Sequence, residues 1–148
     1  MNIYEAKLND ELLEKLISMS AEWEEENSTY GYRKNDRSDI EGNRIFLAEQ
    51  DGEILGYLFG HEEKSERASS IMADGTPYFE IEELYVVPSH RSKGVGRMLF
   101  HDVEQAVKAA GIDFIMLSTA TKNYKSILHF YIDELEMDFW SARLLKKL

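Results

Sequence analysis

The sequence has no cysteine, only two prolines and no long apolar run. Without thiols, disulfide bonds, thiolate zinc sites and a cysteine nucleophile are all excluded. The four histidines are widely spaced and form no ligand pair at helical spacing, so we expect no metal ion: they are His61, His90, His101 and His129. No apolar stretch approaches the roughly 20 residues that a membrane-spanning helix needs, and we expect no membrane partner.

Positive charge is also scarce. The chain carries 17 Lys and Arg against 28 Asp and Glu, a net charge of −11. Such a protein would repel the phosphates of a nucleic acid, so we expect no nucleic-acid partner. The negative field favours a cationic substrate, although net charge alone is a poor guide to what a protein binds.

Length and composition favour one domain. The chain has 148 residues, 43% of them hydrophobic and 30% charged, and shows no repeat, low-complexity stretch or Pro/Gly-rich linker. This length is close to that of a typical domain, so we expect residues 1–148 to form a single domain. The first residues alternate like a strand and lack the basic start and apolar stretch of a signal peptide, so we expect a cytoplasmic protein.

Hydrophobic periodicity predicts both strands and helices. Alternating or unbroken apolar runs predict six strands, at residues 2–7, 44–49, 53–60, 78–87, 114–117 and 139–145. Helical spacing predicts helices at 10–23, 95–110 and 124–135, while 34–43 is a loop or a short helix and 62–76 is a surface loop. Asp51-Gly52 between two apolar runs is a hairpin signal, because the turn needs positive φ. The order predicts a mixed α/β fold with helices on both faces of a sheet.

The junction between residues 78–87 and 95–110 is the segment best suited to bind a ligand. It places Gly94 and Gly96 at the start of a helix, whose first four N–H groups have no partner within the helix and hold anionic oxygens well. Glycine lets the backbone approach a ligand where a Cβ would intrude. Cationic donors are also concentrated here, so we expect a diphosphate as the ligand: they are Arg91, Lys93 and Arg97.

Other glycine-rich phosphate loops do not fit. A dinucleotide-binding fingerprint needs a third glycine, but Leu99 stands at that position. A P-loop needs Gly-Lys-Ser/Thr after the glycines, and that run is absent. The alternative reading is a tight turn with a structural role only.

This junction resembles the GCN5-related N-acetyltransferase (GNAT) superfamily, whose pattern is Arg/Gln-x-x-Gly-x-Gly/Ala after a strand that ends in an apolar-x-Val-x-Pro run. The chain reads Leu84-Tyr85-Val86-Val87-Pro88-Ser89-His90-Arg91-Ser92-Lys93-Gly94-Val95-Gly96 there, and the resemblance extends over residues 78–139. It implies a mixed, mostly antiparallel sheet of about six to seven strands with helices on both faces.

The resemblance also implies acetyl-CoA as co-substrate. Backbone amides of Ser92 to Arg97 would hold its pyrophosphate, and the strand edge at 84–86 would pair with the pantetheine arm and offer an N–H to the thioester oxygen. Polarising that oxygen is an oxyanion-hole role, in which one donor is typically worth ~2.7–4 kcal/mol. The implied cofactor-binding residues are Leu84, Tyr85, Val86, Arg91, Ser92, Lys93, Gly94, Val95, Gly96, Arg97 and Asn123.

Direct attack of an amine on the thioester is the expected route, because a chain without cysteine cannot form a thioester acyl-enzyme. An alkyl amine has a pKa of about 10.4, so a base should remove its proton. In a regular strand Glu80 and Glu82 share a face with Leu84 and Val86, while Glu83 lies on the other face. The resemblance favours Glu82 as the base, with the position of Glu80 used in other family members. The alternative is that these carboxylates only attract substrate or lie solvated at a strand end.

A general acid is expected on the helix at 124–135, where the family pattern is Asn-x-x-Ala-x-x-Phe/Leu-Tyr-x-x-x-Gly-Phe. The chain has Asn123 and Phe130-Tyr131, one residue further apart than in that pattern, and either Glu136-Met137 or Asp138-Phe139 replaces Gly-Phe. The resemblance implies that Tyr131 protonates the departing thiolate of coenzyme A. Tyr131 also falls on an apolar helical stripe, so a position in the core is the alternative.

The acceptor is the least determined ligand. One candidate is an aromatic wall for an amine, formed by Trp23, Tyr30 and Tyr32; the alternative is that these side chains pack under a loop. A second candidate is the acidic run Glu24-Glu25-Glu26, which would attract a polyamine or aminoglycoside; the alternative is a solvated face. We expect N-acetylation of a small-molecule primary amine. The alternatives are a protein lysine or N-terminus as acceptor, or a non-catalytic acyl-CoA-binding regulatory module. The C-terminal segment is shorter than in many relatives, so a last strand completed by a partner subunit in a homodimer would fit.

Overall fold

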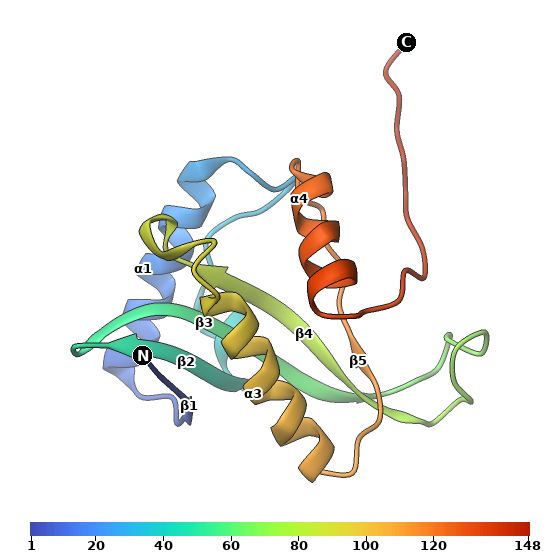
Figure 1. Ribbon diagram of the computed structural model, residues 1–148, viewed down its shortest axis with the longest axis horizontal. Coiled ribbons are helices and arrows are strands. Elements are labelled where there is room, and N and C mark those ends of the chain that lie inside the picture. Colours follow the sequence, from blue (N-terminus) through green and yellow to red (C-terminus); the bar gives the residue numbers. More distant parts are fainter.

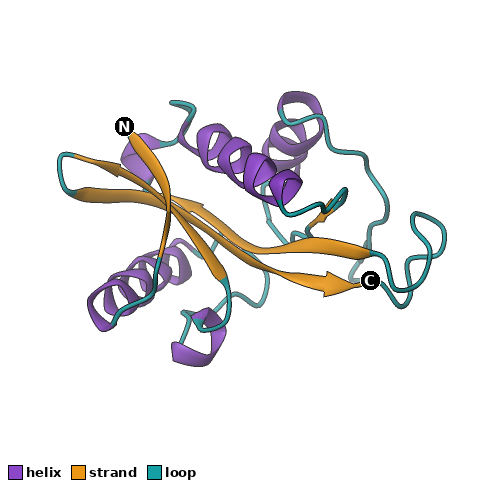
Figure 2. Cartoon of the chain, turned by 90° about the horizontal axis from the view of Figure 1, so that it is seen from below, coloured by secondary structure: helices purple, strands orange, loops and turns teal.

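The computed structural model describes residues 1–148 and contains one five-stranded sheet between two layers of helices (Figures 1 and 2). Four strands pair antiparallel in chain order: β1 (Asn2–Ala6), β2 (Arg44–Gln50), β3 (Glu53–Lys64) and β4 (Pro77–Val86). The fifth, β5 (Ile115–Met116), joins β4 in parallel. The predicted mixed, mostly antiparallel fold is confirmed.

The helices divide the core into two clusters, one on each face of the sheet. Helices α1 (Asp10–Glu26) and α2 (Arg37–Ile40) pack against one face, and α3 (Val95–Ala109) packs against the other, which α4 (Tyr124–Leu128) extends. Asn9 caps α1 by accepting a hydrogen bond from Leu12 N at 2.8 Å. No helix is long and apolar enough to cross a membrane.

The predicted hairpin between β2 and β3 is confirmed. Asp51 and Gly52 both have positive φ, 54° and 79°. Two consecutive positive-φ residues match the right-handed twist of the flanking strands, which is why Asp-Gly is favoured there.

A β-bulge at Glu82 changes which residues of β4 share a face. Phe59 pairs with Glu83 and Gly60 with Ile81, so Glu82 has no partner in β3. Gly60 makes this possible, because a Cβ there would collide with the carbonyl oxygen of Glu80. A bulge shifts the alternation of side chains by one residue.

The predicted alternation along β4 is therefore wrong. Phe79 and Ile81 pack in the α3 cluster, together with Leu84 and Val86 beyond the bulge, while Tyr85 packs in the α1 cluster. Three carboxylates consequently lie on the α1/α2 side of the sheet: Glu80, Glu82 and Glu83.

A π-helical segment, η2 (His129–Glu134), follows α4 in place of a regular helix to residue 135. Its wider turn is closed by Leu135 N donating to Phe130 O, five residues back, at 3.0 Å. One inserted residue in an α-helix is accommodated by such a turn.

Glu136-Met137 takes the place of the family's Gly-Phe. Glu136 has φ 59°, the left-handed conformation that glycine adopts easily after a helix, and Met137 packs against the α3 cluster. Phe139, the alternative counterpart of the family phenylalanine, is exposed.

The sixth predicted strand, at residues 139–145, is absent. The whole segment after Asp138 has no regular structure and is exposed, and β5 is two residues long instead of four. A strand needs a neighbouring edge to satisfy its backbone groups, and this segment pairs with no edge of the sheet.

Replacing Glu136 with glycine should stabilise the fold. A non-glycine residue in the left-handed region costs about 1–2 kcal/mol, part of which is offset by the greater freedom of glycine in the unfolded chain. We expect a gain of about 0.5–1 kcal/mol and a rise in Tm of roughly 1–4 °C by circular dichroism. Glu104→Gly, inside α3, is the control and should lose about 1 kcal/mol. A lower Tm for Glu136→Gly would contradict the assigned register.

Candidate functional site

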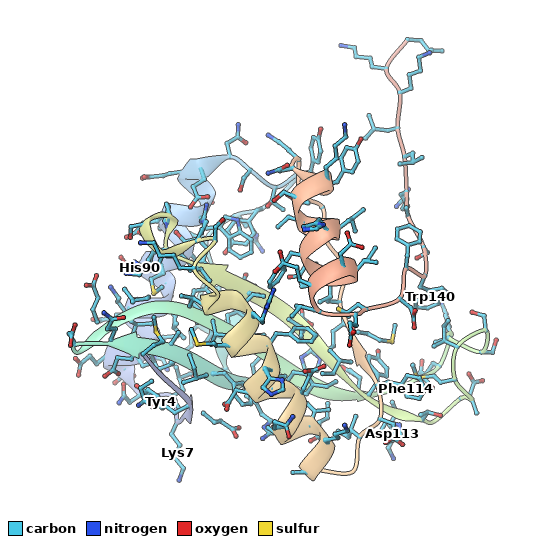
Figure 3. All side chains as sticks on the ribbon, in the orientation of Figure 1. Tyr4, Lys7, His90, Asp113, Phe114 and Trp140 are labelled. Carbon is cyan, nitrogen blue, oxygen red and sulfur yellow. The ribbon has the colours of Figure 1, made fainter.

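The loop between β4 and α3 presents a row of unpaired backbone N–H groups. A short 3-10 turn, η1 (Pro88–His90), leads from β4 into the loop, which His90 marks in Figure 3. Six consecutive N–H groups, from Ser92 to Arg97, donate to no acceptor in the chain. Gly94 has φ 84° with no atom within 4 Å of where a Cβ would stand. The loop therefore offers both donors and open space to an anion.

Gly96 lies close to the ring of Phe130. A Cβ at this position would lie 3.2 Å from the ring of Phe130. The first turn of α3 and the segment η2 thus meet at Gly96, and Tyr131 is the neighbour of the contacting residue, with the two rings 5.1 Å apart.

Two of the three cations predicted at the loop are engaged by carboxylates. Arg91 binds Glu26 through two hydrogen bonds of 2.7 and 2.9 Å and donates to Val86 O at 2.8 Å. Arg97 binds Glu134 at 2.9 Å. Lys93 is exposed and makes no ion pair. Its side chain and the backbone amides are the free positive groups of the loop.

The predicted pantetheine-binding edge of β4 is open. On the side of β5, only Phe79 and Glu80 are paired with that strand. In Figure 1 the two strands meet near the start of β4 and diverge toward the end where α3 begins. No strand pairs with this edge of β4 beyond Glu80, so the backbone groups that face it are open to an extended ligand, except Val86 O, which accepts from Arg91. This stretch includes Leu84, Tyr85 and Val86, which pair with β3 on the other edge.

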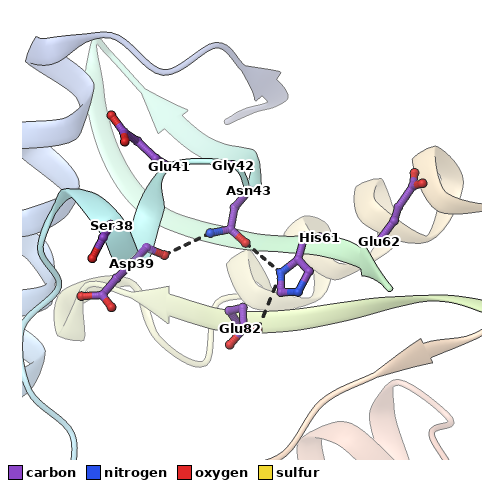
Figure 4. Close-up of a pocket in the computed structure, with 8 residues that line it drawn as sticks. All are labelled: Ser38, Asp39, Glu41, Gly42, Asn43, His61, Glu62 and Glu82. Atoms are coloured by element: carbon purple, nitrogen blue, oxygen red, sulfur yellow. Dashed lines mark hydrogen bonds and ion pairs between the residues drawn. The ribbon is translucent and has the colours of Figure 1, made fainter. Parts of the chain in front are cut away.

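An acidic cleft of about 430 Å³ lies on the α1/α2 side of β4 (Figure 4). All eight lining residues are polar or glycine and none is Lys or Arg: Ser38, Asp39, Glu41, Gly42, Asn43, His61, Glu62 and Glu82. His61 Nδ1 lies 3.6 Å from Glu82 Oε1 and 3.1 Å from Asn43 Oδ1. The concentration of carboxylates suits a cationic ligand.

Glu80, on the same side of the sheet, has a pKa close to neutral pH. Burial, together with the negative charge of Glu82, raises the pKa of Glu80 to about 7. A carboxylate with that pKa can accept a proton at physiological pH. The structure thus brings both predicted base candidates, Glu80 and Glu82, to the same side of the sheet.

Glu83 forms a hydrogen-bonded network that the sequence did not reveal. Its Oε2 accepts from Tyr57 Oη at 2.9 Å, Asn35 Nδ2 at 2.9 Å and Tyr32 Oη at 3.3 Å. Burial raises the pKa of Glu83, while these three hydrogen bonds oppose the rise. The network ties the segment between α1 and α2 to the sheet. Its members are far apart in sequence, so no local pattern brings them together.

The aromatic residues considered for an acceptor wall are divided. Trp23 and Tyr32 stack with ring centroids 4.2 Å apart, and Trp23 also stacks on Tyr85 at 5.4 Å. Tyr30 lies apart and exposed, below Lys122. The acidic run after Trp23 is engaged too, since Glu24 accepts from Lys34 N and Glu26 binds Arg91. Packing accounts for Trp23 and Tyr32.

Tyr131 is half-buried, and its hydroxyl makes no hydrogen bond within the chain. Burial raises its pKa to about 12, so the hydroxyl stays protonated at neutral pH. Asn123 precedes α4, is exposed, and its side-chain amide also makes no hydrogen bond within the chain. Both groups are available to a ligand.

Comparisons with solved structures find the same fold in acetyltransferases. An aminoglycoside acetyltransferase, HMB0005, from an uncultured soil metagenomic sample is 18% identical, with a TM-score of 0.72 over 99% of this chain and 97% of that one. Aminoglycoside N-acetyltransferase AAC(6')-Iy in complex with CoA is 17% identical, with a TM-score of 0.69 over 99% and 98%. A transcriptional regulator from Bacillus halodurans C-125 is 19% identical, with a TM-score of 0.72 over 99% and 100%.

The sequence itself matches a family model. No curated protein sequence matches the chain significantly. The model of the acetyltransferase (GNAT) family matches residues 9–133, which is most of the chain and includes both β4 and the loop before α3. The chain belongs to the acetyltransferase (GNAT) family.

Proposed function

We propose that this protein is an N-acetyltransferase that moves an acetyl group from acetyl-CoA directly to a primary amine of a small cationic molecule. The row of six unpaired N–H groups from Ser92 to Arg97 carries the proposal, because it is suited to a pyrophosphate and to little else in an acidic chain. The proposed domain spans residues 1–148.

The residues present fit coenzyme A. The loop amides and Lys93 would hold the pyrophosphate, and the open edge of β4 from Leu84 to Val86 would pair with the amide-containing pantetheine arm. Asn123, with its free side-chain amide, is a further proposed contact. Coenzyme A supplies the acetyl thioester, and the protein supplies its orientation relative to the amine.

The acidic cleft is the proposed acceptor site. An ammonium group is attracted by the carboxylates of the cleft, which include Asp39 and Glu82. Glu41 also lines the cleft, but it is paired with Arg37 at 2.8 Å. The amine must lose a proton before it attacks the thioester carbon. Glu82 is the proposed proton acceptor, with Glu80 beside it as the competing assignment. Two similar structures, both of aminoglycoside acetyltransferases, support a small amine as acceptor.

Tyr131 is the proposed general acid. As the amine nitrogen bonds to the acetyl carbon, the carbon–sulfur bond breaks and the thiolate needs a proton. The hydroxyl of Tyr131 holds a proton at neutral pH and is not committed to another acceptor in the chain.

Cofactor binding should depend on Gly94. Gly94→Val places a side chain in the open space of the loop and strains a backbone with φ 84°. Acetyl-CoA at 100 times its Kd should stabilise the wild type by about 2.7 kcal/mol, seen as a rise in Tm, and should leave the variant unchanged. The control is Gly75→Val, which has the same strain (φ 81°) in open space on a different loop. If Gly75→Val also loses the response, the strain rather than the site is responsible.

Turnover with different amines tests the acceptor class. Thiol release from acetyl-CoA should appear with aminoglycosides or polyamines, and the cysteine-free protein adds no thiol of its own. Turnover with lysine or N-terminal peptides alone would assign a protein acceptor. Cofactor binding without turnover on any amine would favour the acyl-CoA-binding regulatory module.

The proton acceptor should be identified by a pair of variants. Glu82→Gln should lower kcat by about 10²-fold or more at every pH, because it removes the proposed base. Glu80→Gln keeps that base, so its rate at high pH should stay close to wild type. The wild type should show an inflection of kcat/KM near pH 7 from deprotonation of Glu80 as pH rises, and Glu80→Gln should lack it. The reverse pattern would assign the base to Glu80.

Tyr131→Phe should slow the chemical step without weakening cofactor binding. The removed hydroxyl has no partner in the chain, so the fold loses no hydrogen bond. We expect kcat to fall by about 10²-fold and the Kd for acetyl-CoA to stay unchanged. Tyr124→Phe, an exposed tyrosine on α4, is the control. Unchanged turnover in Tyr131→Phe would remove Tyr131 from the mechanism.

A further inference from the structure

His61 is the histidine of the acidic cleft, and a fixed amide determines the role of its Nδ1 (Figure 4). Asn43 donates its Nδ2 to Asp39 O and Ile40 O, at 3.0 and 3.1 Å. The amide is therefore oriented with its Oδ1 toward His61 Nδ1, 3.1 Å away. Because an amide oxygen only accepts hydrogen bonds, His61 Nδ1 must carry the hydrogen of this contact.

The second ring nitrogen of His61 also faces an acceptor. Its Nε2 lies 3.0 Å from Glu63 Oε1, and an ionised carboxylate accepts hydrogen bonds but does not donate them. A neutral imidazole has one N–H and can satisfy only one of these two contacts, whereas an imidazolium satisfies both. The two contacts together therefore favour the cationic form of His61.

The ring of His61 lies beside two carboxylates of β4. His61 pairs with Glu80 in the register of β3 and β4, and its Nδ1 is 3.6 Å from Glu82 Oε1. This ion pair is the one polar contact that the Glu82 carboxylate makes within the chain, since neither of its oxygens accepts a hydrogen bond. The other oxygen, Oε2, is therefore open to a ligand in the cleft.

Building on the proposed function, we propose that His61 is a positioning residue for the base: its positive charge orients Glu82 and keeps the Glu80–Glu82 pair ionised. Two neighbouring carboxylates oppose each other's ionisation, and a cation between them relieves that repulsion. In this role His61 neither gains nor loses a proton. Glu82 takes the proton of the amine, and the amine nitrogen then attacks the thioester carbon.

The charges around His61 leave it as the cation of the cleft. No Lys or Arg lines the cleft, and Arg37 and Arg44 are bound to the carboxylates of Glu41 and Glu5. Burial and the charge of Glu82 raise the pKa of Glu80 to about 7, and the charge of His61 opposes that rise. The carboxylates near the ring come from three elements: Glu80 and Glu82 on β4, Glu62 and Glu63 on β3, and Asp39 and Glu41 at α2.

The pH profile of His61→Gln is the first test. The variant removes the positive charge, so the ionised form of Glu80 loses a favourable neighbour and its pKa rises. The inflection of kcat/KM near pH 7 should move to higher pH by about one unit. His61→Lys restores a positive charge and should return the inflection toward the wild-type value. A merely structural role would lower the rate at every pH and leave the inflection in place.

His101→Gln, on α3 at the other face of the sheet, is the matched control and should leave the profile unchanged. An unmoved inflection in His61→Gln, or no recovery in His61→Lys, would overturn the role of His61.

NMR titration of the glutamate carboxyl groups separates this proposal from the proposed function, because it requires no turnover. Glu80→Gln and Glu82→Gln assign the two signals, and the pair should titrate at higher pH in His61→Gln than in the wild type. Identical titrations would overturn the proposal even in an active enzyme. A shifted titration in a protein that acetylates no amine would support the pairing with His61 and overturn the acetyltransferase proposal instead.

Discussion

The bulge in β4 is the constraint on which the acceptor side of the protein depends. Since Glu82 has no partner in β3, the strand changes its alternation there, and apolar residues on both sides of the bulge remain in the α3 cluster. Without the bulge, Glu80 and Glu82 would project into the α3 cluster, where a carboxylate is costly to bury. With it, one strand supplies a continuous apolar face to α3 and three carboxylates to the other side. Gly60 is the residue that permits it, because any Cβ would meet the carbonyl of Glu80.

The open edge of β4 and its α1/α2 face are proposed to bind different substrates. Its open edge toward β5 and the loop that follows it present backbone N–H groups, which suit an acyl donor with amide and phosphate groups. Its α1/α2 face presents side-chain carboxylates, which suit an amine. An acetyl thioester held at the edge of this strand would therefore lie next to an amine bound on the α1/α2 face. Direct transfer between them needs no covalent intermediate on the protein.

Short-range sequence patterns predicted the glycine loop and the general architecture. The β4 bulge, the Glu83 network and the absence of a sixth strand depend on pairing between distant segments, which the sequence does not show. The glycines after β4, the Asp-Gly hairpin and the spacing of α3 each depend on neighbours a few residues apart, so they could be found in the sequence. The bulge depends on the register of β3 against β4, and the Glu83 network joins Asn35, Tyr57 and Tyr32 across three segments. The sixth strand was predicted from a real apolar alternation, but a strand forms only where an edge receives it. The π-turn at η2 was not predicted, because helical spacing over residues 124–135 gives no sign of a hydrogen bond that reaches five residues back.

Electrostatics explains how an acidic protein can serve a highly anionic donor. Arg91 and Arg97 are bound to Glu26 and Glu134, so they contribute little net positive charge to the loop. What remains is a row of oriented N–H dipoles, the start of α3 and Lys93. Such dipoles act over a short range and demand a ligand of matching shape, whereas the carboxylates of the cleft attract any cation over a longer range. Donor recognition is thus set by backbone geometry, and acceptor recruitment by charge. The net charge of −11 repels the anionic donor as it approaches. Once the donor is bound, its contacts are with the loop N–H groups and Lys93, which no carboxylate of the chain neutralises.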